Sequence, residues 1–175
     1  MSLLPQAKAA DRRQQNADTY DRLYVSLVDG LGLLQILIAV CDRDSQRYAT
    51  IERYESDLEG VAECLRVQLQ PGRLNVKSAI EETISATLGA TGAMADLPIV
   101  VTVEGAERLD AAALRELFGY LQWTREGLRE LAIPLVFWFP GNFLPDLAKK
   151  APDFWSWRNG VFIFGSEEVD LRQHG

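Results

Sequence analysis

Acidic and hydroxyl side chains follow two apolar runs of this sequence, in positions that suit a site for a divalent cation or a phosphate group. These side chains belong to Asp42, Asp44, Ser45, Glu104 and Glu107. The first three follow the run Leu34–Cys41, and the last two follow the β-branched run Ile99–Val103. The carboxyl ends of parallel strands form the edge where α/β sheets bind ligands. We therefore expect one pocket at this edge.

Two interpretations of that pocket follow from the residue types. Carboxylate oxygens are the ligands that Mg²⁺ and Ca²⁺ prefer, so Asp42, Asp44 and Glu104 could form a weak divalent-cation site. In the alternative interpretation, Glu104 caps a turn while Glu107 and Arg108 face solvent. We assign no metal site on this pattern alone.

The elements that would position these residues alternate between strands and helices. We predict strands over residues 34–41, 65–69, 99–103, 134–139 and 160–164. We predict helices over residues 6–28, from Asp44 or Ser45 as N-cap to about 65, and over 76–88, 111–131 and 143–150. Runs that are apolar on both faces suit strands covered on both sides. The pattern predicts an α/β fold, a three-layer, about five-stranded parallel sheet with helices on both faces.

Length and composition indicate one globular domain. The chain has 175 residues, of which 47% are hydrophobic, enough for a full core. We expect a single α/β domain over 1–175, with an N-terminal helix in 1–30, a sheet core in 33–165 and a loose tail in 166–175. The first half of the helix is polar and is expected to project or fray.

Charge, cysteines and hydropathy exclude several classes of function. The net charge of −7 and pI near 4.8 argue against nucleic-acid binding, which needs a basic surface. Only Cys41, Cys64 and the near-terminal His174 are available, which excludes a zinc site or a histidine-based triad. The longest uninterrupted apolar part, Leu33–Cys41, is too short to span a membrane. We expect a cytoplasmic protein without a membrane partner.

Two segments resemble signalling P-loop ATPases of the STAND or NACHT-like class. The strand 99–103 followed by Glu-Gly-Ala-Glu-Arg-Leu resembles their Walker B segment, with Glu104 at the Mg²⁺-holding position and Glu107 near the second acidic position. The segment PLVFWFPGNFLPDLAKKAPDFWSWRNGVFIF, residues 134–164, resembles the sensor-strand region of bacterial NACHT-like or AAA-like domains. The resemblance implies a P-loop ATPase-like core. It places the strand 134–139 between the first strand and the strand 99–103.

The phosphate loop of that class is degenerate here. A Walker A motif, GxxxxGK[ST], wraps the phosphates in backbone N–H groups and supplies a lysine. The matching segment Cys41–Arg47 contains no glycine and is too short to wrap a phosphate. Asp42 and Asp44 would repel a triphosphate by about 1 kcal/mol or more each. We therefore expect no catalytic residue, no cofactor and no ATP binding in the ordinary mode.

The same acidic edge is also partly similar to a phospho-receiver domain. Glu104 would then stand at the phosphoacceptor position, which needs an aspartate. The strand 134–139 ends without the expected Thr or Ser, and the strand 160–164 ends without the expected Lys. These departures speak against receiver function.

Aromatic residues are dense near the C-terminus. In one interpretation they pack the two helix layers, with Trp155 and Trp157 as a lid over the sheet edge. In the other they lie at the strand C-termini as a protein-binding surface, because Trp and Arg are enriched in binding hot spots. The interaction candidates are Trp155, Trp157, Arg158, Asn142 and Phe143.

The function we expect is that of a non-catalytic protein-interaction or regulatory module on a degenerate P-loop ATPase-like fold, with protein partners. The alternative is a nucleotide-binding or NTPase domain that uses an atypical phosphate loop or borrows a Lys or Arg from a neighbouring subunit. The sequence leaves the partner's identity and the oligomeric state open.

Overall fold

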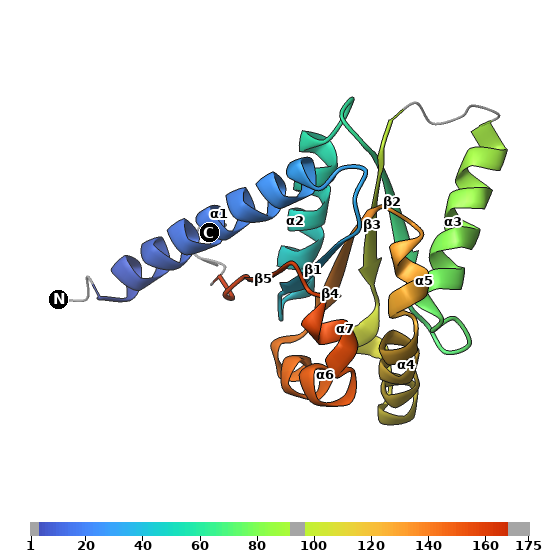
Figure 1. Cartoon of the computed structure of the whole chain (residues 1–175). Helices are drawn as coiled ribbons and strands as arrows, with labels where there is room; N and C mark the ends of the chain where they lie inside the picture. Colours follow the sequence, from blue (N-terminus) through green and yellow to red (C-terminus); the bar gives the residue numbers. More distant parts are fainter. Residues whose placement is uncertain (1–3, 92–96, 168–175) are drawn as a thin grey trace.

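The computed structural model describes residues 4–91 and 97–167. Its centre is a five-stranded, all-parallel sheet in the order β2-β3-β4-β1-β5 (Figure 1). The strands are β1 (Gln35–Val40), β2 (Glu63–Gln68), β3 (Ile99–Glu104), β4 (Pro134–Phe139) and β5 (Gly160–Ile163). The α/β class and the parallel sheet are confirmed, and β4 lies between β1 and β3 as expected.

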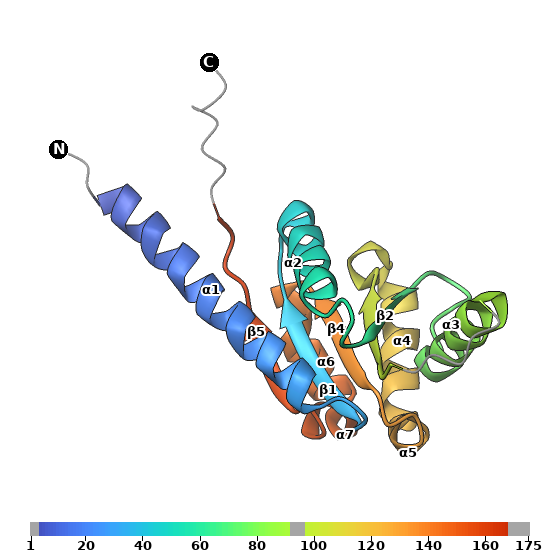
Figure 2. The ribbon, with the colours of Figure 1, turned by 90° about the horizontal axis from the view of Figure 1, so that it is seen from above.

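Helices cover both faces of this sheet, so the three layers are confirmed (Figure 2). The helices are α1 (Leu4–Asp29), α2 (Asp44–Asp57), α3 (Val76–Thr91), α4 (Ala111–Trp123), α5 (Arg125–Arg129), α6 (Leu144–Lys150) and α7 (Pro152–Ser156). Two 3₁₀ turns, Ala106–Arg108 and Gly141–Phe143, follow β3 and β4. The helices α1 and α2 share one face, and the remaining helices pack on the other.

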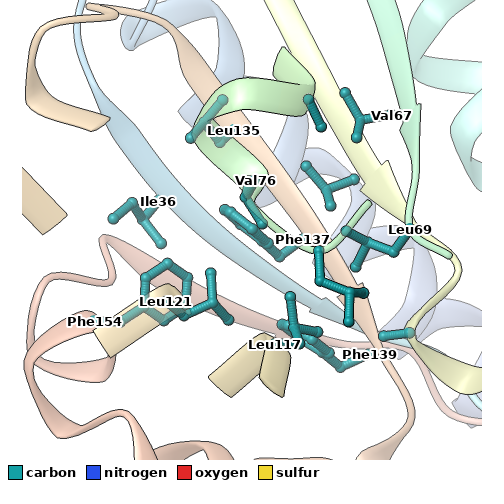
Figure 3. Packing of buried hydrophobic residues seen from close by; sticks show 14 of the residues in the cluster. Ile36, Val67, Leu69, Val76, Leu117, Leu121, Leu135, Phe137, Phe139 and Phe154 are labelled. Carbon is teal, nitrogen blue, oxygen red and sulfur yellow. The ribbon is translucent and has the colours of Figure 1, made fainter. Parts of the chain in front are cut away.

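Alternating side chains divide each central strand between the two helix layers. In β1, Ile36 and Ile38 join the larger core cluster, whereas Leu37 and Ala39 face α1 and α2. All six residues of β4 are buried, which explains why this strand is apolar throughout. Figure 3 shows the larger cluster, where the Phe154 ring of α7 meets Phe137 edge-on at 5.1 Å between centroids.

Three predicted helices have different limits in the structure. The helix expected to reach residue 65 ends at Asp57, because Gly60 adopts a left-handed turn (φ 78°) before β2 begins. The helix expected over 111–131 is divided at Thr124 into α4 and α5. The helix α3 continues through Gly89, which was expected to lie in a loop, to Thr91.

The remaining differences lie near the C-terminus. The helix expected over 143–150 is α6, preceded by a 3₁₀ turn, and the prediction missed α7. Proline stands in the first turn of both α6 and α7, a position compatible with helix initiation. Asp110 is the N-cap of α4, since its side chain accepts a 2.8 Å hydrogen bond from the Ala113 amide.

The first half of α1 is exposed and extends away from the sheet (Figure 1). Its second half buries Tyr20, Leu23 and Leu27 against β5 and its neighbours. Ser166 and Glu167 were expected to begin a loose tail, but both are held. The Ser166 carbonyl accepts from Arg12 at 3.1 Å, and the Glu167 amide donates to Gln46 at 3.3 Å. The rest of that predicted tail, 168–175, lies outside the described residues.

Within the described ranges, the structure contains no helix with both the length and the apolar character needed to cross a bilayer.

Candidate functional site

The end of β3 places Glu104 under α2. Alternation along the strand points Val100, Thr102 and Glu104 toward this helix layer, and Glu104 is only 6% exposed. The next residue, Gly105, has φ 103°, and a Cβ there would lie 2.6 Å from the Leu69 carbonyl oxygen. Only glycine fits this turn, which therefore fixes where the Glu104 carboxylate lies.

The connection from β1 to α2 consists of Cys41, Asp42 and Arg43, so it is as short as the sequence indicated. The helix begins at Asp44, and Arg43 stands at the N-cap. The prediction of Asp44 or Ser45 as N-cap was therefore wrong by one or two positions. The Arg43 side chain donates to the Glu167 carbonyl instead of capping the helix.

A buried arginine lies between the acidic residues of the predicted pocket. The Arg47 guanidinium is 2.9 Å from the Asp44 carboxylate and 3.0 Å from that of Glu107, and the residue is 2% exposed. Burial alone would lower the pKa of Arg47, but the charges of Glu107 and Asp44 outweigh it and raise this pKa. An ion pair of the chain itself thus fills the space between α2 and the turn after β3.

This arrangement corrects the expected place of Glu107. Its side chain is 16% exposed and bound to Arg47, so it does not face solvent as one interpretation held. Arg108 is exposed, and its guanidinium donates to the Tyr48 hydroxyl at 2.9 Å. Our sequence interpretation gave Arg47 no structural role. Arg47 precedes Ile51 and Tyr54 by four and seven positions, so it lies on the buried face of α2. This helical spacing was the signal in the sequence that Arg47 is buried.

Glu104 remains poorly compensated beside this pair. Its Oε2 atom is buried without a hydrogen-bond partner among the described residues. Burial raises the pKa of Glu104, against the opposing charges of Arg66 and Arg47. Arg66 is engaged elsewhere, by the Glu55 carboxylate. The Glu104 carboxylate is therefore buried without an ion-pair partner among the described residues.

The other two pocket residues lie apart from this pair. Asp42 is exposed, and its Oδ1 accepts from the Gly141 amide at 2.9 Å, which ties the end of β1 to the turn after β4. Ser45 is exposed on the first turn of α2. No group of three or more potential metal ligands occurs in the part of the chain that the structure describes. The alternative of a divalent-cation site at Asp42, Asp44 and Glu104 is therefore not supported.

A groove of about 480 Å³ opens at the carboxyl ends of β1 and β5, beside α1. Among its lining residues are Arg12, Asn16, Val40, Asp42, Gly141 and Phe164. Of the five predicted pocket residues, Asp42 alone lines it. The groove and the Arg47 ion pair are thus two different places at the same edge of the sheet.

The five interaction candidates divide between opposite edges of the sheet. Asn142 and Phe143 follow β4 at its carboxyl end. Trp155, Trp157 and Arg158 precede β5, whose first residue pairs with Leu37 near the start of β1. They therefore lie toward the amino edge, and the expectation that they gather at the strand C-termini was wrong. Arg158 and Asn142 are exposed, while the other three are half-buried.

Comparison with solved structures identifies the fold. One chain in a structure of Drosophila ORC bound to poly(dA/dT) DNA and Cdc6 aligns at a TM-score of 0.53 with 13% identity, covering 92% of this chain and 31% of that one. One chain in the corresponding structure with GC-rich DNA aligns at a TM-score of 0.52 with 13% identity, covering 92% of this chain and 30% of that one. This chain shares the fold of those two chains, here a five-stranded parallel sheet with helices on both faces.

The extent of this likeness is limited. The chain spans about 30% of the length of the chains that it matches in these complexes. No protein-family model matches the sequence, and no curated protein matches it. The comparison therefore establishes the arrangement of strands and helices.

One expectation from composition was wrong. Net charge was taken to exclude nucleic acid, yet both of these structures are of complexes bound to DNA. Net charge averages over the whole surface, whereas nucleic-acid contacts depend on the local arrangement of charged groups. The acidic composition of this chain does not exclude a nucleic-acid partner.

Proposed function

We propose that this chain is a non-catalytic protein-interaction or regulatory module on an AAA-type scaffold with a degenerate Walker A segment. The observation that supports it most directly is the buried Arg47, which contacts both Asp44 and Glu107. In an active site of this class, an acidic pair holds Mg²⁺ and a flexible glycine-rich loop surrounds the phosphates. Here the chain's own guanidinium pairs with Glu107, the second residue of that acidic pair, and with Asp44 at the start of α2.

The energetics of this pair oppose nucleotide binding in the ordinary mode. A triphosphate bound there would have to displace Arg47 from Glu107 and leave a buried charge without its partner, which costs several kcal/mol. The connection of Cys41, Asp42 and Arg43 supplies neither a glycine nor a lysine to compensate for that loss. The scaffold would therefore serve partner binding without turnover.

Thermal unfolding with Mg²⁺ and ATP tests this proposal. A ligand at a hundredfold its dissociation constant adds roughly 2.7 kcal/mol to stability, so we expect no shift in Tm at millimolar nucleotide. A shift that Glu104→Ala abolishes would contradict the proposal and indicate an NTPase. The control is Glu52→Ala, an exposed position of α2, which should leave any shift unchanged.

A nucleotide-binding domain with an atypical phosphate site is the second candidate. This second function is favoured by the groove of about 480 Å³ beside α1, whose lining includes Arg12 and Asp42. A groove of this volume is large enough for a small ligand. In that case a Tm shift with ATP should respond to Arg12→Ala and be insensitive to Glu104→Ala. The two outcomes separate the two places at this edge.

The structures with a similar fold make DNA a partner to be tested. Because ORC chains with this fold occur in complexes with poly(dA/dT) and GC-rich DNA, both kinds of duplex belong in the binding assays beside protein partners. Fluorescence anisotropy at two salt concentrations would measure this, since phosphate contacts give a steep salt dependence.

We further propose a STAND or NACHT-like lineage, a cytoplasmic setting and one folding unit over the chain. Free thiols at Cys41 and Cys64 agree with a reducing compartment. A single, coincident unfolding transition by fluorescence and circular dichroism is expected for one unit. Two separated transitions would contradict it.

A further inference from the structure

Two arginines near the amino edge of the sheet are stacked on tryptophans. The Arg158 guanidinium carbon lies 4.1 Å from the centroid of the Trp155 ring, and that of Arg129 lies 4.8 Å from the Trp157 ring. Both tryptophans pack against the larger core cluster, while both arginines are exposed. We call these four residues the Arg–Trp surface. Because the rings are anchored in the core, the guanidinium groups above them are held in place.

The two guanidinium groups retain capacity to bind an anion. Neither is within ion-pair distance of a carboxylate among the residues that the structure describes, in contrast to the buried Arg47. Arg158 uses one donor on the Trp155 carbonyl at 2.8 Å, out of five N–H donors in its planar group. Such a planar group pairs with a carboxylate through two parallel hydrogen bonds.

An exposed aromatic residue lies on the neighbouring helix. Trp123, at the end of α4, is 85% exposed. The preceding residue, Gln122, exchanges two hydrogen bonds of 2.9 and 3.0 Å with Asp153 of α7. These bonds hold the end of α4, which carries Trp123, against α7, the helix that carries Trp155.

We propose that the Arg–Trp surface binds an acidic polypeptide segment in which separated carboxylates pair with Arg129 and Arg158 while an apolar side chain covers Trp123. This inference rests on the proposed function and names the chemistry of the partner. Spacing between charges distinguishes the ligand classes here. Glu126 lies on α5, Glu130 directly follows it and Asp153 lies on α7. A continuous row of phosphates would be repelled by these carboxylates. Carboxylates spaced along a peptide can avoid it.

A peptide selection tests the proposal directly. A phage-displayed library of random dodecapeptides is selected on the immobilised full chain and counter-selected on the Arg129→Gln/Arg158→Gln double variant. We expect enriched peptides with at least two Asp or Glu residues flanking an apolar or aromatic residue. Enrichment of neutral or basic peptides, or no enrichment, would overturn the proposal.

Affinity measurements on one enriched peptide then assign the contacts. By fluorescence anisotropy we expect the Arg129→Gln/Arg158→Gln variant to weaken binding tenfold or more, and Trp123→Ala to weaken it severalfold. The control is Arg115→Gln, an exposed arginine of α4, which should bind as the parent chain does. The variant Arg129→Lys/Arg158→Lys keeps the charge but loses the paired donors, and it should bind more weakly than the parent.

Two further outcomes distinguish this inference from the broader proposal. Displacement of the peptide by single-stranded oligothymidine at equal concentration would assign the surface to nucleic acid and overturn the acidic-peptide proposal. If ATP gives no Tm shift while the double variant leaves peptide binding unchanged, the non-catalytic module stands and this inference fails. If ATP gives a shift that depends on Glu104, the proposed function fails whatever the peptide result.

Discussion

The two edges of the sheet treat their charged residues in opposite ways. At the carboxyl edge, the Arg47 guanidinium is buried and paired with Glu107, and Asp42 is bound to a backbone amide. At the amino edge, Arg129 and Arg158 are exposed on tryptophan faces, and no carboxylate pairs with them in the described part of the chain. The charged groups at the carboxyl edge are engaged by other groups of the chain, whereas the two arginines at the amino edge remain accessible to solvent.

The edge where α/β sheets usually bind ligands is therefore not the edge of this chain that carries exposed arginines without a carboxylate partner among the described residues. A charge that is buried and paired contributes to the structure, and removing its partner is costly. A charge held on an exposed aromatic face contributes little to stability and remains available to a partner. The following variants test whether the two edges really differ in this way.

The largest effect is expected from Arg47→Ala. This change removes the nearer of two cations from the Glu107 carboxylate, which is 16% exposed, and leaves only the exposed Arg108 at 3.8 Å. We expect a loss of about 3–5 kcal/mol in the free energy of unfolding, measured by urea denaturation. Arg53→Ala, on the exposed side of α2 with a 4.0 Å ion pair, is the control and should cost about 1 kcal/mol or less. Equal losses in the free energy of unfolding for Arg47→Ala and Arg53→Ala would show that the buried ion pair is worth no more than an exposed one.

The second largest loss in the free energy of unfolding is expected from Glu107→Gln. It keeps the shape of the side chain but replaces a charge-assisted hydrogen bond to Arg47 of 3.0 Å with a neutral one. We expect a loss of about 2 kcal/mol in the same urea measurement. Glu116→Gln, at an exposed position of α4, is the control and should have little effect. A neutral result at Glu107 would mean that the pair does not stabilise this edge.

Glu104→Gln should act in the opposite direction. The folded state raises the pKa of Glu104 because burial disfavours its charged form, so the ionised carboxylate lowers stability at neutral pH. We expect the amide to add about 1 kcal/mol near pH 7. As the pH falls through the raised folded pKa toward the ordinary value near 4.5, protonation removes the penalty and the advantage of the variant should vanish. An advantage that grows toward acidic pH would contradict this assignment.

The smallest change in stability is expected at the amino edge. Arg129→Gln and Arg158→Gln remove exposed cation–π contacts, each worth about 0.5–1 kcal/mol. In urea denaturation each variant should lose no more than that, although we expect the double variant to bind the peptide tenfold or more weakly. Phe154→Ala, which removes a ring buried beneath this surface, should cost about 3–5 kcal/mol and serves as the positive control. A comparable loss at Arg158 would show that this edge is structural as well.

Much of the fold could be predicted from local patterns. The five strands were located because each is an apolar run bounded by turn residues, and their alternation with helices implied a parallel sheet. Helix limits were less accurate where continuity of apolar spacing hid a break, as at Thr124, or where a turn such as that at Gly60 interrupted the helix early. A short helix such as α7, with five residues, has too few positions to show a periodicity.

The candidate site was predicted in part. The connection between β1 and α2 is as short as the sequence indicated, and its inability to surround a phosphate stays a prediction. The role of Arg47 was missed because its partner Glu107 is sixty residues away along the chain. The interaction candidates were grouped by sequence proximity, although α6 and α7 separate Asn142 from Arg158 across the sheet.

The sequence by itself determined the class of fold, the alternation of its five strands with helices, and the short connection between β1 and α2. These properties depend on periodicity and on residue types within short segments. Only the tertiary structure decided which charges are buried and paired and which remain exposed. The physical reason is that burial and ion pairing depend on contacts between distant segments, here between α2 and the turn after β3 and between α5 and α7.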